Sequence, residues 1–131
     1  MAGRSLFTFP LHLGSGGKAL PQPEFFGMEW YEGYGERHGS DGLEGRLVSL
    51  HRFDESWTSW EMHPTGDEVV LCVAGRIVLL QQLTDGRERT VELGPGDYAI
   101  NGPGVWHTAD VEGPATALFI TVGEGTQHKP R

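Results

Sequence analysis

Four residues between positions 61 and 107 carry side chains that can coordinate a metal ion: Glu61, His63, Glu68 and His107. Glu61 and His63 are two positions apart, so an extended strand projects both to one side. Glu68 follows after the turn-forming segment 64–67 (PTGD), so it can open the next strand and face the same cavity. His107 follows a Gly-Pro-Gly turn on a later strand. Two imidazoles and two carboxylates suit a divalent transition metal such as Fe, Mn, Ni, Co or Zn.

The elements that position these residues are predicted to be short strands separated by tight turns. Glycine and proline together make up 28 of 131 residues (20 Gly and 8 Pro), roughly twice their usual share. Thirteen aromatic residues (4 Trp, 6 Phe and 3 Tyr) argue against disorder. No segment has helical periodicity, and eight segments of strand length predict an all-β sandwich or barrel. They are Leu43–Phe53, Trp57–His63, Glu68–Ala74, Arg76–Leu83, Thr90–Leu93, Tyr98–Asn101, Val105–Val111 and Ala115–Val122.

Two motifs around these strands resemble those of the cupins, which are small jelly-roll β-barrels. The first cupin motif reads HxH, three or four residues, Glu, six residues, Gly, and here Glu61-x-His63, Glu68 and Gly75 follow that spacing, with Glu61 in place of the first histidine. The second motif reads Gly-Asp, several residues, Pro-Gly, two residues, His. The segment 96–107 (GDYAINGPGVWH) is similar to it, and it ends at His107.

The resemblance implies a cupin-type jelly roll with one divalent metal (Fe, Mn, Ni or Zn) held by Glu61, His63, Glu68 and His107. The replacement at Glu61 leaves three readings open for that residue: a ligand, a general base beside a metal with three ligands, or a hydrogen-bonding residue outside the ligand set. With two carboxylates the site would be neutral around a dication and would favour the harder ions Mn and Fe. Glu61 and Glu68 are also the candidate catalytic residues, since either carboxylate can move protons.

The chain length fits one domain. We expect residues 1–42 to form an N-terminal arm with loops, including a loop at 32–42, and residues 43–131 to form the cupin barrel. The net charge of −8 without a basic cluster excludes nucleic acid and anionic membranes as expected partners. No apolar run reaches the length of a membrane span. A single cysteine, Cys72, excludes an intrachain disulfide and favours the cytoplasm.

Three functions are compatible with these observations. The first is a metal-dependent enzyme acting on a small organic molecule, with a dioxygenase as the leading reaction and an isomerase or lyase as further possibilities. The second is a non-catalytic module that binds or senses a small ligand. The third is a structural dimeric barrel without a ligand. Family membership alone does not decide among them.

Strand alternation makes further predictions about individual residues. Trp60 and Met62 face outward if Glu61 and His63 face inward, so they need cover from the N-terminal segment or from a second subunit, and we expect a homodimer.

Cys72 is expected to be buried, and His51 to be a core or edge histidine. The remaining histidines, His12, His38 and His128, are expected to be solvated. The candidate substrate anchors are Arg46, Arg52, Gln81 and Tyr98.

Overall fold

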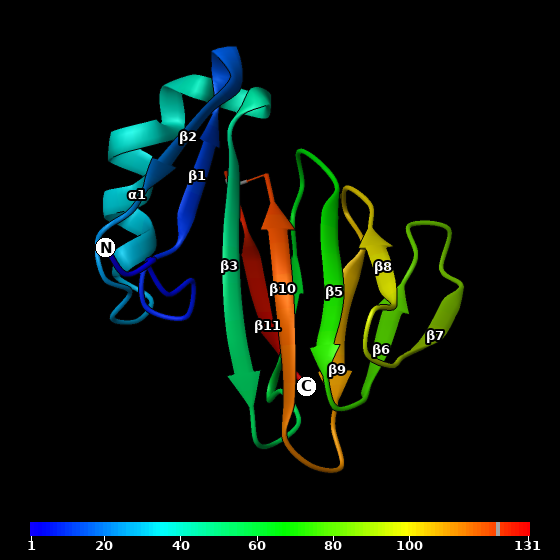
Figure 1. Cartoon of the computed structure of the whole chain (residues 1–131). Helices are drawn as coiled ribbons and strands as arrows, with labels where there is room; N and C mark the ends of the chain where they lie inside the picture. The colour runs from blue at the N-terminus through cyan, green and yellow to red at the C-terminus, as the bar shows by residue number, and fades with distance from the viewer. Residues whose placement is uncertain (123) are drawn as a thin grey trace.

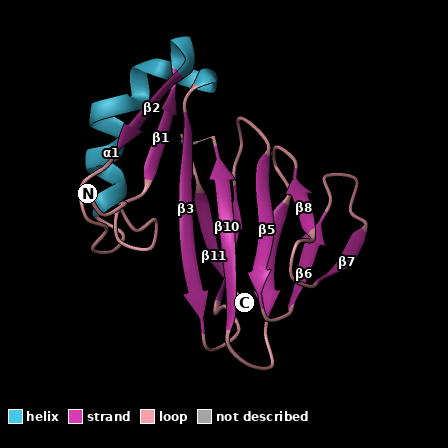
Figure 2. Ribbon diagram, in the orientation of Figure 1, coloured by secondary structure: helices cyan, strands magenta, loops and turns pink. Residues whose placement is uncertain are grey.

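The computed structural model describes every residue except position 123. Two antiparallel sheets pack face to face as a jelly-roll sandwich, and a short helix lies beside one edge of it (Figures 1 and 2). The elements in chain order are β1 (Leu11–Gly14), η1 (Ser15–Gly17), β2 (Lys18–Pro21), α1 (Trp30–His38), η2 (Gly39–Glu44), β3 (Arg46–Phe53), β4 (Ser59–Met62), β5 (Glu68–Ala74), β6 (Ile77–Gln82), β7 (Glu88–Leu93), β8 (Tyr98–Asn101), β9 (Trp106–Asp110), β10 (Ala115–Thr121) and β11 (Gln127–Pro130).

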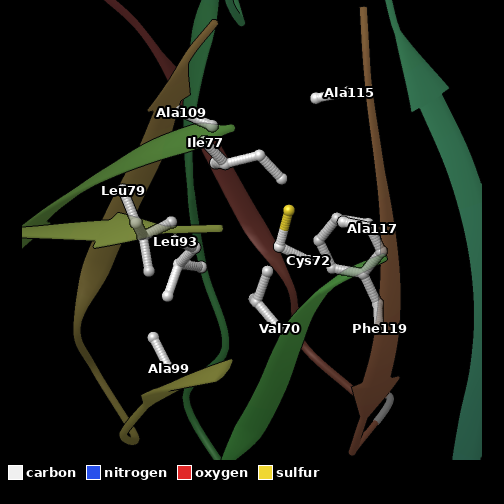
Figure 3. Close-up of a cluster of buried hydrophobic side chains, with 10 residues drawn as sticks. All are labelled: Val70, Cys72, Ile77, Leu79, Leu93, Ala99, Ala109, Ala115, Ala117 and Phe119. Carbon is white, nitrogen blue, oxygen red and sulfur yellow. The ribbon is translucent and has the colours of Figure 1, made fainter. Parts of the chain in front are cut away.

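The all-β prediction is confirmed, and each of the eight expected strands overlaps an observed one. The first sheet has the order β2-β1-β3-β10-β5-β8, and the second has the order β11-β4-β9-β6-β7. Inward side chains of both sheets form one apolar core, shown in Figure 3. Its members include Val70 and Cys72 from β5, Leu79 from β6 and Phe119 from β10. The expected burial of Cys72 is confirmed, since its side chain has no exposed surface.

The segment before residue 43 is more ordered than the sequence pattern predicted. Strand β1 pairs with β3 and β2 pairs with β1, so residues 11–21 extend the first sheet at its edge. The expectation of a loop at 32–42 is wrong, because α1 covers much of that range. Gly33 and Gly35 lower the helix propensity of this segment, so its local sequence does not predict a helix. It is held instead by tertiary packing: Trp30 and Tyr34, one turn apart, are buried and cluster with Leu47.

The C-terminal strand β11, also not predicted, pairs with β4. Its Lys129 lies over the rings of Trp60 and Trp106, with the ammonium 5.7 Å and 4.5 Å from the two ring centroids. Trp60 and Met62 are therefore half-buried, and part of their cover comes from this strand. None of the described helices has the length and apolar character that crossing a membrane requires.

Candidate metal centre

The structure brings Glu61, His63, Glu68 and His107 together between the two sheets. Glu61 lies on β4 directly opposite His107 on β9. His63 follows the end of β4, where the Gly104 amide donates a hydrogen bond to its carbonyl and so joins the turn before β9 to the end of β4. Glu68 is the first residue of β5. The strand break at 64–67 thus acts as expected, because it allows Glu68 to face the same space as His63.

Potential ligand atoms of the four side chains all lie within 4.8 Å of one another. The Nε2 atom of His63 is 2.9 Å from Glu61 Oε1 and 2.9 Å from Glu68 Oε2. The Nε2 atom of His107 is 3.1 Å from Glu68 Oε1 and 3.7 Å from Glu61 Oε1. His63, Glu68 and His107 are buried, whereas the Glu61 side chain keeps 26% of its surface exposed toward the cavity.

Both buried Nε2 atoms lack a hydrogen-bond partner, because their contacts with the carboxylate oxygens are close but poorly aligned. Buried polar atoms are rarely left unpaired, and such an atom calls for an explanation. Two unpaired imidazole nitrogens and two carboxylates converging on one point have the chemistry of a first-row metal site. The residues present therefore fit a divalent ion.

Neighbouring hydrogen bonds orient the two imidazoles. His107 Nδ1–H donates to the Val105 carbonyl at 3.3 Å, so Nε2 is the nitrogen free to bind an ion. His63 Nδ1 is 2.9 Å from the Thr126 hydroxyl. Orienting partners of this kind are typical of metal-binding histidines. Thr126 was missed by sequence reasoning, because it reaches the site from the irregular segment before β11.

A buried hydrogen-bond chain fixes Glu68. Its two carboxylate oxygens accept from the Asn101 amide at 3.1 Å and from the Thr121 hydroxyl at 2.8 Å. The Gln81 amide donates to Asn101 Oδ1 at 2.7 Å, and Arg89 Nε donates to Gln81 Oε1 at 2.8 Å. Gln81 is thus part of this support rather than a substrate anchor. The inward alternation of Asn101 with Ala99 was the one available signal for its position.

The charges of the four groups are strongly coupled. Burial lowers the pKa of His63 and of His107, but contact with the Glu61 and Glu68 carboxylates outweighs burial and raises each pKa to about 9. Burial raises the pKa of Glu61 and of Glu68, and the two imidazoles outweigh it, so both pKa values lie below their usual range. Without an ion, the centre at pH 7 therefore holds two imidazolium cations and two carboxylates.

Ion binding at this centre is expected to release protons. Below pH 9 an incoming ion displaces the Nε2 protons of His63 and His107, about two per ion, so affinity rises with pH by up to ~100-fold per unit and levels off above pH 9. Titration calorimetry in buffers of different ionisation enthalpy measures the number released. A release close to zero at pH 7 would contradict the charge state assigned to the two histidines.

A cavity of about 920 Å³ opens beside the four residues, within the range of small-molecule sites. Its wall includes several aromatic side chains and combines the barrel with the N-terminal segment. The lining residues include Phe25, Met28, Tyr31, His51, Phe53, Trp57, Phe119 and His128. Burial, together with the charges of Glu61 and Glu68, raises the pKa of Tyr31 to about 12, so its hydroxyl stays protonated and can donate a hydrogen bond.

The lining residues that the structure describes include no lysine or arginine. The expected substrate anchors Arg46, Arg52 and Tyr98 therefore do not reach the cavity; Arg52 pairs with Asp54, and Tyr98 is exposed on β8. His51 lines the cavity with its ring against Phe25 and Phe119, and burial lowers its pKa. His128, expected to be solvated, is exposed but lies 3.2 Å from Glu61 Oε2.

Comparison with solved structures supports the same fold. Hydroquinone 1,2-dioxygenase from Sphingomonas sp. TTNP3, solved with 4-hydroxybenzoate, aligns over 58% of this chain and 59% of its own, with a TM-score of 0.50 and 21% identity. An oxalate oxidase aligns over 62% of this chain and 44% of its own, with a TM-score of 0.55 and 12% identity. In both cases the matched part is less than two thirds of the other protein.

Oxalate decarboxylase from Bacillus subtilis, a protein with Mn(II) centres, aligns over 73% of this chain and 26% of its own, with a TM-score of 0.56 and 15% identity. A search of curated protein sequences finds no match. The cupin domain family, in contrast, matches residues 51–123, more than half of the chain, and the match contains all four clustered residues. The chain therefore belongs to the cupin family.

Proposed function

We propose that this cupin is a metal-dependent enzyme that binds one divalent transition ion through Glu61, His63, Glu68 and His107. The observation that carries the proposal is the pair of buried Nε2 atoms without hydrogen-bond partners, aimed at two carboxylates. Two carboxylates neutralise a dication and favour Mn or Fe over softer ions. When bound, such an ion supplies Lewis acidity and a position for substrate or O₂.

The cavity indicates the class of substrate. Its wall offers Phe25, Phe53, Trp57 and Phe119 for stacking, and its described lining contains no lysine or arginine to bind a carboxylate. With its two carboxylates, the centre loaded with a dication also carries no net positive charge to attract an anionic substrate. We therefore propose an uncharged aromatic molecule, such as a phenol, with oxidative ring cleavage as the leading reaction. Hydroquinone 1,2-dioxygenase, whose structure holds 4-hydroxybenzoate, is one dioxygenase with a similar fold.

The two glutamates are suited to different roles. Glu68 is buried and accepts hydrogen bonds from Asn101 and Thr121, so its carboxylate is held in one place. Glu61 is partly exposed to the cavity, and His128 lies beside its second oxygen. Glu61 is therefore the better placed to accept a proton from a substrate hydroxyl, while Glu68 fixes the ion and its charge. The Tyr31 hydroxyl can orient a polar group of the substrate.

The apolar character of the cavity favours a second candidate, a cupin that binds an aromatic ligand without converting it. The two candidates differ in turnover. Purified protein loaded anaerobically with Fe²⁺ or Mn²⁺ is mixed with hydroquinone, catechol or another phenol, and O₂ uptake and ring-opened products are followed. We expect consumption of both O₂ and phenol. Saturable binding without consumption in either metal form would support the non-catalytic candidate.

Two substitutions at Glu61 test its place in the site. Glu61→His is expected to preserve or strengthen metal binding, because it adds a third imidazole to the centre, at a ligand position. Glu61→Gln is expected to lower turnover by ~100-fold or more, because the amide cannot accept a proton. Metal analysis and O₂ uptake on both variants give the answer. Complete loss of metal in Glu61→His would contradict a ligand role.

We also propose a homodimer, with the cytoplasm as its compartment. On the outer face of the first sheet, β8 is an edge strand, and it pairs with β5 so that Tyr98 lies beside Leu71 and Ile100 beside Val69. Tyr98, Ile100 and Val73 are exposed there. A second copy packing on this apolar face would cover both the face and the edge.

Light scattering at micromolar concentration is expected to give twice the chain mass, and Ile100→Lys to give a monomer. A monomeric parent protein would reject this.

A further inference from the structure

A second group of potential ligands lies outside the cavity, where the N-terminal segment meets the first sheet. It consists of His12 on β1, His38 at the end of α1 and Asp41 in η2, with one ligand atom of each within 4.8 Å of the others. The expectation that His12 and His38 are solvated is wrong: His12 has no exposed surface and His38 is half-buried. A β-strand and an α-helix, unrecognised in the sequence, enclose them.

The geometry around His12 directs its Nε2 atom toward the other two residues. Nε2 is 2.6 Å from Asp41 Oδ2, and the imidazoles of His12 and His38 stack with centroids 4.0 Å apart and planes 15° from parallel. Two nitrogens bound to one tetrahedral ion lie roughly 3.3 Å apart. In the stack the two ring planes are nearly parallel, so the His38 imidazole must rotate out of it for both rings to direct a nitrogen at one ion.

Glycines keep the space around this cluster open. A Cβ atom at Gly14 would lie 2.9 Å from Asp41 Oδ2 and 3.1 Å from His12 Nε2. A Cβ atom at Gly45 would lie 3.0 Å from His12 Cε1. The cavity at this point measures about 20 Å³, which is room for one water-sized occupant. Part of the glycine excess before residue 46 thus clears a small polar cradle.

We propose that His12, His38 and Asp41 form a second site for a divalent first-row cation, with water completing its coordination. Two imidazoles and one carboxylate are a common donor set for zinc and its neighbours. The hydroxyl of Tyr34 is 2.6 Å from His12 Nδ1. With the ion on Nε2, Nδ1–H donates to the Tyr34 oxygen, which is the outer contact that metal-binding histidines usually make.

This site would fasten the N-terminal segment to the barrel. His12 belongs to a strand paired with β3, whereas His38 is the last residue of α1 and Asp41 lies just after it. Phe25 and Met28, which line the main cavity, lie just before the same helix. An ion shared by His12, His38 and Asp41 joins these elements and stabilises the folded state by mass action. The inference is independent of the proposed enzyme activity, because it concerns a different set of side chains.

The test counts bound ions by titration with Zn²⁺ or Co²⁺ after removal of any affinity tag. The wild-type protein is expected to bind two equivalents, and the His63→Ala/His107→Ala variant one. Asp41→Asn keeps a hydrogen-bond acceptor for His12 but weakens the ligand set, so in either background it is expected to lower affinity for one equivalent more than 10-fold. His38→Ala should do the same. Asp85→Asn, an exposed residue paired with Arg87, is the matched control and should change nothing.

Thermal unfolding gives a second readout that does not depend on the main centre. Zn²⁺ is expected to raise the unfolding temperature of the His63→Ala/His107→Ala variant, and Asp41→Asn is expected to abolish that rise. No ion bound by the double variant, or binding insensitive to both Asp41→Asn and His38→Ala, would overturn the second site. If the wild-type protein bound no ion, both sites would be overturned. If the wild-type protein bound a single equivalent and Asp41→Asn removed it, only the main centre would be overturned.

Discussion

A His107→Ala variant is expected to bind Mn²⁺ or Fe²⁺ at the main centre more than ~100-fold more weakly than the wild type and to lose any metal-dependent turnover. Removal of an orienting partner alone typically costs 10- to 100-fold in affinity, and His107 is a proposed ligand. Its Nε2 is one of the two unpaired buried imidazole nitrogens among the described residues, and the ring has no exposed surface through which water could replace it. Titration calorimetry and metal analysis measure the loss.

His51→Ala is the matched control for this experiment. His51 is another histidine of the cavity wall, but its ring packs against Phe25 and Phe119 and is not part of the metal cluster. Its removal is expected to leave ion affinity within about threefold and to change only the binding of aromatic ligands. Circular dichroism checks that both variants fold. Equal effects of the two substitutions would mean that His107 acts through packing rather than coordination.

The second large effect concerns Gly75, which ends the first cupin motif. Its φ is +76°, and a Cβ atom there would lie 2.4 Å from the Pro114 carbonyl oxygen and 2.9 Å from Ala115 Cα. Both contacts are with backbone, so no side-chain rotation relieves them. Gly75→Ala is expected to destabilise the fold by about 3 kcal/mol or more, and to lower the unfolding temperature by about 10 °C.

Gly86 provides the control, because a substitution there introduces the strain of a positive φ without a steric clash of the added Cβ atom. Its φ is +88°, and a Cβ atom there would meet nothing within 4 Å. Gly86→Ala should therefore cost only the strain of a positive φ, about 1 kcal/mol. Calorimetric or fluorescence-monitored unfolding compares the two variants. If both lose the same stability, then the close approach of β5 to the start of β10 is not what requires glycine at position 75.

The barrel and the four-residue cluster were predictable because local patterns define them. Turn-forming residues lie at both ends of these strands. The predicted limits of Glu68–Ala74 and Tyr98–Asn101 are therefore those of β5 and β8. The motif spacing identified Glu61 and His107 as members of one site, and the two residues lie opposite each other on β4 and β9. Both signals lie within a few residues of the features that they predict.

The rest depends on contacts between distant segments. Helix α1 contains two glycines and is held by Trp30 and Tyr34 against the barrel, which no local pattern reveals. No local pattern reveals the position of Tyr31 either. It lies 30 residues before Glu61 in the sequence, yet it is close enough in space for the Glu61 carboxylate to raise its pKa. Pairing of β11 with β4 brings His128 to Glu61. Such tertiary contacts override local propensity.

The cavity wall has two origins in the chain. The four clustered residues lie within the part that matches the cupin family, residues 51–123, whereas Phe25, Met28 and Tyr31 lie before it. The proposed metal ligands therefore lie in one stretch of sequence, whereas part of the wall that would contact a small molecule comes from another. Exchange of residues 22–38 between related barrels is expected to change which small molecule the cavity accepts without altering the segments that carry the proposed metal ligands. The segment before the barrel is the natural place to begin engineering a new selectivity.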